Sequence, residues 1–531
     1  MRVAPNDPGL VYVQARAAAM SGDHARAAGL LASLAEAEPN QADLARKALI
    51  EAVGAGQIDL ALQLATNLPP AKLTPDARLL LAAQELRRNQ PNRALQWLRT
   101  PSETGTLEFI TPLLTAWAYA DRGDLKDALQ TVQQIPPNSL LGPLRAEQQA
   151  LILLKFRRAA EAEPFAKQAA ESAGSRENQV RLALADGFLA AGDQARALAI
   201  VEGMGTETAI ARQRILARRA SGQGIDTPAK AFSEVLTGFA ADVARLERAA
   251  APVGLVQVAR YANPQNSSAA ILLALLLDGQ GRSNEALAVL RSVADNDALN
   301  AQVRDVQVRI LIDEKRLAEA YQVAQVAALR PDAGISDFSR MGDVYEAMKR
   351  HDQAADAYGR AAQLATAQGL KTELWPLLLL RASALEEGKR WPEAKESLQQ
   401  ALAIAPDQPL LLNFLGYAQL ERGENMDSAE AMIRKASDLA PDDASITDSL
   451  GWAQFKRGKV ADAIATLQRA AEKDPDQAEI QEHLGDALYT SGRRIEARFA
   501  WNAGLLTAED DVATRLKAKI AAGLSSANAA P

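Results

Sequence analysis

The sequence lacks cysteine and has only three histidines among its 531 residues. Without cysteine there can be no disulfide, thiol nucleophile or thiolate-bound metal. His24, His351 and His483 lie in distant parts of the sequence, so we do not expect them to converge. The motifs of the P-loop, the dinucleotide fold, the serine hydrolase elbow and the HExxH metalloprotease are also missing. We therefore predict no catalytic residues, no metal and no cofactor.

Aromatic residues make up only 5% of the chain, and neither sign of charge dominates. The 59 Lys and Arg residues stand against 66 Asp and Glu residues, for a net charge of −7. A general nucleic-acid binder needs a basic face, so we expect no nucleic-acid partner. The longest apolar runs, Ile271–Leu277 and Leu377–Leu380, are far shorter than the roughly 20 residues of a membrane span. We therefore predict no membrane-spanning helix.

Alanine and leucine are abundant, a composition that favours helix over sheet. A single compact core rarely exceeds roughly 300 residues, so a chain of this length divides into domains or grows as a repeat array. His483 and Asp486 lie three residues apart and would share one face of a helix. One imidazole and one carboxylate are too few ligands for a metal site, so we expect them to be structural.

One alanine recurs at nearly constant spacing through most of the chain. The steps are 33 to 35 residues, with longer steps of 55 and 40 residues before the eighth and eleventh members. We call these residues the alanine series: Ala27, Ala61, Ala94, Ala128, Ala162, Ala197, Ala231, Ala286, Ala320, Ala354, Ala394, Ala429, Ala463 and Ala497.

Small and large residues flank the series at fixed offsets. Twelve residues before the alanine stands a small residue, as at Gly451 and Gly485, and four residues after it stands a large one, as at Leu467 and Trp501. These spacings predict two helices per unit, with the small residue of the first helix (A) against the large residue of the second (B). A glycine lies between the helices in several units, where a helix end favours a left-handed residue: Gly123, Gly192, Gly423, Gly458 and Gly492.

A period of 34 residues is that of the tetratricopeptide repeat (TPR). The sequence therefore predicts an all-α fold, a right-handed TPR superhelix (α-solenoid) of about 14 helix-turn-helix units. Solenoids need a polar cap on the last apolar face, and we expect residues 509–531 to form a capping helix followed by a frayed tail. The long step after Ala231 divides an N-terminal arm, 1–262, from a C-terminal arm, 263–508, with an irregular extra helix near 240–262.

The repeat register also predicts a binding surface. In a TPR superhelix the A helices line the concave wall, and residues three and four apart share one face of a helix. In the three best-preserved units the inward positions carry aromatic and polar residues, the types found at binding hot spots. The alternative is that some of them contact neighbouring A helices inside the stack. The predicted groove residues are Asn413, Tyr417, Leu420, Glu421, Asp448, Trp452, Phe455, Lys456, Glu482, Asp486 and Tyr489.

The stretches RWPEAKESLQQALAIAPDQPLLLNFLGYAQLERGEN, DSLGWAQFKRG and EHLGDALYTSGRRIEARFAWNAGL resemble a proteobacterial family of long TPR proteins. The resemblance covers roughly residues 374–506. It implies export, with a place in the periplasm or at the outer membrane. Some members resemble the lipoprotein adaptor that activates a carboxy-terminal processing protease. This chain departs from that pattern, because MRVAPNDPGL is not a signal peptide and no lipobox cysteine follows; a native N-terminus of this kind predicts a cytoplasmic protein.

The sequence thus predicts a non-catalytic scaffold or adaptor whose partners are other proteins, held as a peptide or helix in the concave groove. Two alternatives stay open. The chain could be a structural assembly component that self-associates through its convex surface or ends. It could also be a regulatory adaptor subunit of a periplasmic protease. The sequence leaves the partner's identity and the oligomeric state open.

Overall fold

The computed structural model describes residues 7–99, 107–139, 141–202, 204, 207–245, 251–331 and 333–530. Within these ranges the regular structure consists of α-helices and four short 3-10 helices, with no strand. The predicted all-α solenoid fold is confirmed. No helix in the described ranges is both long and apolar enough to cross a membrane.

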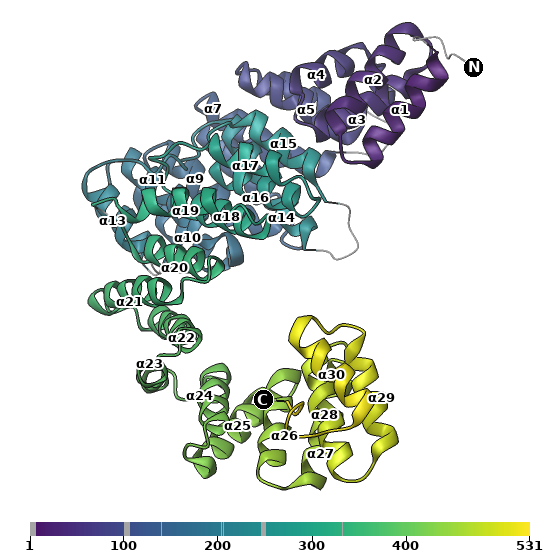
Figure 1. The fold of residues 1–531 in the computed structure, drawn as a ribbon. Helices are drawn as coiled ribbons and strands as arrows, with labels where there is room; N and C mark the ends of the chain where they lie inside the picture. Colours follow the sequence, from purple (N-terminus) through teal and green to yellow (C-terminus); the bar gives the residue numbers. More distant parts are fainter. Residues whose placement is uncertain are drawn as a thin grey trace. The chain divides into compact units, whose positions relative to one another are not determined.

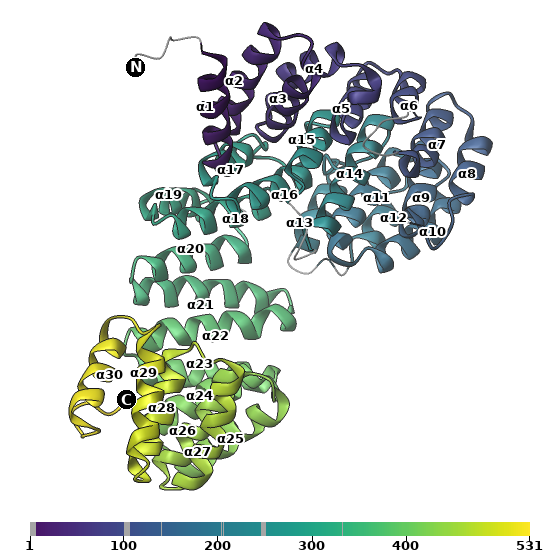
Figure 2. The same cartoon turned by 90° about the vertical axis from the view of Figure 1, so that its right-hand side faces the viewer.

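The chain forms two compact units, Met1–Arg340 (unit one) and Met341–Pro531 (unit two), and the division falls inside α20 (Ile335–Ala347). Figures 1 and 2 show the helices of each unit in two views. The predicted arms, 1–262 and 263–508, group the repeats by sequence spacing, whereas the two units group them by contacts.

The helices of unit one are α1 (Pro8–Met20), α2 (His24–Ala37), α3 (Ala42–Gly54), α4 (Ile58–Asn67), α5 (Pro75–Arg87), α6 (Pro91–Arg99), α7 (Thr111–Asp121), α8 (Leu125–Gln133), α9 (Arg145–Lys155), α10 (Ala159–Ser172), α11 (Glu177–Ala190), α12 (Gln194–Ile200), α13 (Glu207–Leu216), α14 (Pro228–Ala244), α15 (Val253–Ala262), α16 (Ser267–Asp278), α17 (Ser283–Arg291), α18 (Asn300–Asp313), α19 (Leu317–Ala328) and the start of α20. The 3-10 helices are η1 (Pro70–Lys72), η2 (Glu108–Ile110), η3 (Gly142–Leu144) and η4 (Gly174–Arg176).

The helices of unit two, after the end of α20, are α21 (His351–Ala367), α22 (Lys371–Glu387), α23 (Trp391–Ile404), α24 (Pro409–Glu421), α25 (Met426–Leu439), α26 (Ala444–Lys456), α27 (Val460–Lys473), α28 (Ala478–Thr490), α29 (Arg494–Leu505) and α30 (Asp510–Ala522). Within the described ranges the helices form fourteen A–B pairs, and α15 and α30 stand outside the pairs.

The alanine series marks the same place in every pair. Each of its fourteen members is the fourth residue of helix B, and each is 0% exposed. The matching small residue on helix A lies against the large residue of helix B: a Cβ added to Gly451 would lie 2.6 Å from Leu467. A larger side chain at either position would force the two helices apart. The period of the sequence is therefore the period of one helix contact.

The A–B turns contain a residue with positive φ. The five predicted turn glycines have φ between 66° and 89°, as expected for a left-handed residue at a helix end. In other turns a residue with a side chain takes this conformation, as at Asn89, Lys315, Lys349 and Lys389 (φ 57° to 60°). Because the residue with positive φ in these turns is not glycine, the sequence does not mark its position.

We expect Lys389→Gly to stabilise unit two, because a non-glycine residue in the left-handed region costs about 1 kcal/mol. Glycine also loses more chain entropy on folding, so the net gain should be a few tenths of a kcal/mol to about 1 kcal/mol. Urea unfolding measures the change. Lys389→Ala is the control, since alanine keeps the β-carbon that causes the strain; an equal gain from both variants would contradict this account.

The extra helix predicted near 240–262 corresponds to α15; residues 246–250 of that stretch lie outside the described ranges. α15 packs against α3 and α5, far earlier in the chain, as well as against α14 and α16. The Arg87 side chain donates to the Tyr261 carbonyl at 3.3 Å. At the end of α3, the Gly54 carbonyl accepts a hydrogen bond at 3.2 Å from the side chain of Arg282, the residue before α17. The inserted helix thus ties early and late repeats of unit one together.

The end of unit two follows the last helix pair. α30 occupies the place of the predicted capping helix, and the described residues that follow it, 525–530, make contacts with the unit. The Asn528 side chain accepts the Ser525 N–H at 2.7 Å and donates to the Gly523 carbonyl at 2.9 Å, which forms a compact turn. Beyond it, Ala530 is only 6% exposed. An apolar cluster and a carboxylate acceptor contact Ala530, as described below.

Candidate functional site

The predicted groove residues lie on the first helices of three successive pairs in unit two. α24 contacts α26, α26 contacts α28, and α28 contacts the capping helix α30. We call the surface formed by these residues the A-helix face: Asn413, Tyr417, Leu420, Glu421, Asp448, Trp452, Phe455, Lys456, Glu482, Asp486 and Tyr489.

The structure divides these residues into an open and a buried set. Lys456 is exposed, and the half-buried residues are Asn413, Tyr417, Glu421, Phe455 and Tyr489. The buried residues are Leu420, Asp448, Trp452, Glu482 and Asp486. The open set remains a candidate contact surface, whereas the buried set contacts neighbouring helices inside the stack. That second arrangement is the alternative left open by the sequence.

Trp452 does not lie on an open wall. It is 1% exposed, and its ring stacks on Phe455 at 5.0 Å and on His483 of the next A helix at 4.1 Å between centroids. Its indole N–H donates to Glu421 on the preceding A helix at 3.2 Å. Its ring therefore packs between neighbouring A helices, which is the alternative that the sequence left open for some of these residues.

His483 and Asp448 form a buried pair between α28 and α26. The imidazole Nδ1 lies 2.9 Å from the Asp448 carboxylate. Burial lowers the pKa of His483, but the Asp448 carboxylate outweighs burial, with smaller contributions from Asp486 and Glu482, so the pKa is raised. The imidazolium form is therefore favoured in the folded protein. His483 pairs with Asp448 and not with Asp486, the residue that the sequence placed beside it.

We expect His483 to make the stability of unit two depend on pH. A group whose pKa is raised on folding stabilises fully below its unfolded pKa, about 6.5 for histidine, and loses this contribution as pH rises through the folded value. Urea unfolding of the wild type and His483→Gln between pH 5.5 and 9 measures the effect. The stability difference between the two should shrink as pH rises. A difference that is constant or grows with pH would contradict the assignment.

A second buried charge cluster joins α28 to α30. Lys519, which is 0% exposed, donates to Glu482 and to Asp486 at 2.7 Å each. Arg515, one turn earlier, donates to Glu482 at 2.7 Å. Asp486 also accepts the indole N–H of Trp501 at 3.0 Å. Two acidic residues four apart on α28 thus face two basic residues four apart on α30.

The pKa values of the two carboxylates in this cluster shift in opposite directions. For Glu482, burial raises the pKa, but hydrogen bonds and charge from Arg515 and Lys519 outweigh it and lower the pKa overall. For Asp486, burial prevails over Lys519, and the pKa is raised. Glu482 has two cations to compensate its burial, whereas Asp486 has one cation and must rely on neutral donors. Asp486 is therefore the acceptor in this cluster that gains most from an additional N–H group.

Lys519→Met should destabilise unit two by about 3 kcal/mol, because removing one partner of a buried ion pair leaves an uncompensated charge. Chemical denaturation of the full-length chain measures the loss. Lys517→Met is the matched control, since Lys517 lies two residues earlier on α30 and is exposed; its effect should stay within about 0.5 kcal/mol. Similar losses from both variants would show that the cluster does not hold the cap.

The tail after α30 lies on the A-helix face. The Ala530 backbone N–H donates to the Asp486 carboxylate at 3.1 Å. Its side chain joins a buried cluster that contains Leu420 and Trp452, with Tyr417 and Phe455 packed at its edge. Figure 1 shows the chain end beside these helices. A segment of the chain itself thus contacts the A-helix face.

Two open-set residues offer polar groups. The Asn413 Oδ1 atom is buried and has no hydrogen-bond partner in the described part of the chain. The hydroxyl of Tyr417 stays protonated, because burial and then the charges of Glu421 and Asp448 raise its pKa.

In the described ranges, no three or more His, Asp or Glu residues cluster as a metal site would require. His24 lies 2.6 Å from Glu51, and His351 lies 3.1 Å from Glu346. Each imidazole, like that of His483, pairs with one carboxylate from its own neighbourhood. These pairs are explained by local charge compensation.

Comparison with known families identifies part of the chain. Residues 379–444 match the model described as a tetratricopeptide repeat, and residues 451–492 match the model described as a TPR repeat. The three A helices of the A-helix face, α24, α26 and α28, fall largely within these two segments. The predicted repeat type is confirmed there. No curated protein sequence matches the chain.

Several solved structures resemble the chain. The hetero-tetramer Cut9–Hcn1 of the APC/C has 15% identity over 98% of this chain and 97% of that chain, with a TM-score of 0.39. A tetratricopeptide repeat protein from Parabacteroides merdae has 16% identity over 48% of this chain and 96% of that chain, with a TM-score of 0.38. YrrB, a TPR protein with an unusual peptide-binding site, has 15% identity over 37% of this chain and 97% of that chain, with a TM-score of 0.28. At these TM-scores the likenesses carry no argument about function. Proteobacterial origin, the protease-adaptor role and the cell-envelope location remain predictions from resemblance.

Sequence analysis missed the residues that complete the site, namely Arg515, Lys519 and Ala530. Glu482 and Asp486 are four residues apart, as are Arg515 and Lys519, and a helix places such pairs on one face. Matching the acidic pair on the last A helix with the basic pair on the cap would have revealed the ion cluster. No signal in the sequence marks Ala530, one small residue among many.

Proposed function

We propose that the chain is a non-catalytic scaffold that binds a peptide segment of a partner protein along the A-helix face of unit two. The observation that carries the proposal is the tail lying on this face. The face accepts the backbone N–H of Ala530 through Asp486 and takes its side chain among Leu420 and Trp452. A surface that contacts both the backbone and the side chain of a non-helical segment has the properties of a peptide-binding site.

The open residues around the tail suit recognition. Tyr417, Phe455 and Tyr489 are half-buried aromatics on three successive A helices, and aromatic side chains supply much of the energy of protein interfaces. Lys456, 5.2 Å from the Trp452 ring centre, adds a positive charge beside Glu421. The stacked Trp452 and His483 beneath them fix the positions of the A helices, so little ordering cost accompanies binding.

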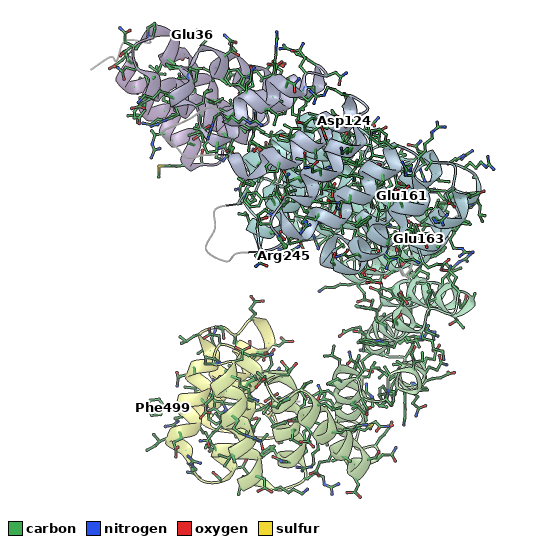
Figure 3. The ribbon with its side chains drawn as sticks, turned by 180° about the vertical axis from the view of Figure 1, so that it is seen from behind. Glu36, Asp124, Glu161, Glu163, Arg245 and Phe499 are labelled. Carbon is green, nitrogen blue, oxygen red and sulfur yellow. The ribbon has the colours of Figure 1, made fainter. Side chains whose placement is uncertain are left out.

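A second candidate function, self-association, is favoured by a different surface. Ile495, Phe499 and Leu506 lie along α29 and its end, and all three are largely exposed. Phe499 is 72% exposed and points away from the unit in Figure 3. An apolar stripe of this kind is a candidate contact between copies of the chain.

Two aromatic-to-alanine variants separate these functions. Phe455→Ala removes an aromatic ring from the A-helix face, and Phe499→Ala removes one from the α29 stripe. Partners are first captured by crosslinking in the native source, and the affinity of a captured partner is then measured with purified chains. We expect Phe455→Ala to weaken binding roughly tenfold, equivalent to about 1.4 kcal/mol, and Phe499→Ala to leave it unchanged.

Thermal unfolding shows whether each variant remains folded, and sedimentation reports self-association. Equal affinity of wild type and Phe455→Ala for the partner would overturn the proposed function. Concentration-dependent dimerisation of the wild type that Phe499→Ala abolishes would instead establish the second candidate.

A further inference from the structure

The tail leaves α30 in a direction set by its first residue. Gly523 has a φ of 84°, a conformation that other residues rarely adopt. A Cβ at this position would also collide with the Tyr489 hydroxyl, so the chain turns closely over this open aromatic residue of the A-helix face. The Ser525–Asn528 turn follows, and two residues later the chain reaches Ala530. The tail therefore contacts the face at both of its ends.

Two features hold Ala530: one contacts its backbone N–H group and the other contacts its small side chain. Its backbone N–H meets Asp486, the buried carboxylate whose pKa is raised. Its methyl group joins a cluster of buried residues from α24, α25 and α26, and at 6% exposure a longer side chain would have to displace its neighbours. Leu524 packs at the edge of the buried cluster around Trp501, and Asn528 closes the turn, while Ser525, Ser526, Ala527 and Ala529 are exposed. The tail, residues 523–530 (GLSSANAA), contains no charged side chain.

We propose that residues 523–530 are a built-in occupant of the A-helix face, and that a partner segment must displace them to bind. The inference rests on the proposed function and specifies the partner. The segment is uncharged and turns as the tail does, and it carries a small side chain at the position of Ala530. Its backbone N–H at that position takes over the bond to Asp486. A segment with a large or acidic residue there is excluded by the packed cluster and by the Asp486 charge.

The tether sets how strongly the tail competes. Six residues separate Gly523 from Ala530, and a short flexible linker gives an effective concentration in the millimolar range. If the free tail peptide binds the empty face with a Kd of about 0.1 mM, the tethered tail weakens the binding of any competing segment roughly tenfold. The tail would exclude weak, non-specific segments while a tighter partner still displaces it.

The test uses a synthetic peptide of residues 523–530, blocked at both ends and labelled with a fluorophore. Its binding is measured by fluorescence anisotropy to the full-length wild type, Ala530→Glu and Ala527→Glu. Ala530→Glu places a carboxylate beside Asp486 and a longer side chain in the cluster, so it should release the tail. Ala527→Glu adds the same charge at an exposed position. We expect the peptide to bind Ala530→Glu at least tenfold more tightly than the other two chains.

A peptide with Glu at the position of Ala530 should not bind any of the three chains. A chain that ends at residue 523 is the second empty-face variant, and it should behave like Ala530→Glu; thermal unfolding verifies its fold. Equal peptide binding by the wild type and both empty-face variants would overturn the inference, as would no binding to either. The proposed function is judged separately, by the effect of Phe455→Ala on the captured partner, so the tail can fail as an occupant while the face remains a binding site.

Discussion

The close approach of two helices at one alanine is the contact on which the rest of the structure depends. In all fourteen pairs this alanine is the fourth residue of helix B and has no exposed surface. A methyl group is the largest side chain that such an approach accepts. Because the contact repeats, each pair presents its A helix to the next in the same way. The A-helix face is a consequence of this repetition.

Where the repetition ends, a buried charge cluster adds to the apolar packing of the cap. The last A helix, α28, has no following repeat, and its outward positions carry Glu482 and Asp486. Two buried acids need cations, and the capping helix supplies Arg515 and Lys519. The cap therefore closes the stack with directional bonds, which fix its register on α28 more strictly than apolar contacts would. That register also sets where the tail begins and brings Ala530 to Asp486.

The same cluster links stability to recognition. Asp486 lies in the ion cluster, accepts the Trp501 indole and accepts the tail backbone. Trp452, which was predicted as a binding residue, stacks on His483 and forms part of the floor under the tail. The residues that hold the A helices together and the residues that contact the tail are thus neighbours on the same helices. The two groups differ in their exposure. The buried side chains hold the helices in place, and the half-buried side chains remain open to a ligand.

Much of the fold could be predicted from the sequence because it follows from one repeated contact. The spacing of the alanine series determined the helix pairs, their register and the three A helices that carry the candidate site. The left-handed turns at Lys315, Lys349 and Lys389 could not be predicted, since the surrounding helices impose that conformation on residues that do not favour it. The packing of α15 against α3 and α5 depends on segments more than 150 residues apart.

Tertiary structure alone decided which site residues are open. Trp452 and Tyr417 occupy the same repeat position, yet Trp452 is enclosed by His483 and Phe455 while Tyr417 stays half-buried. Exposure depends on the neighbouring side chains across the stack, which the period does not encode. The place of the tail was decided in the same way. Ala530 is an ordinary alanine in the sequence. Only folding places an apolar cluster and the buried Asp486 carboxylate beside it.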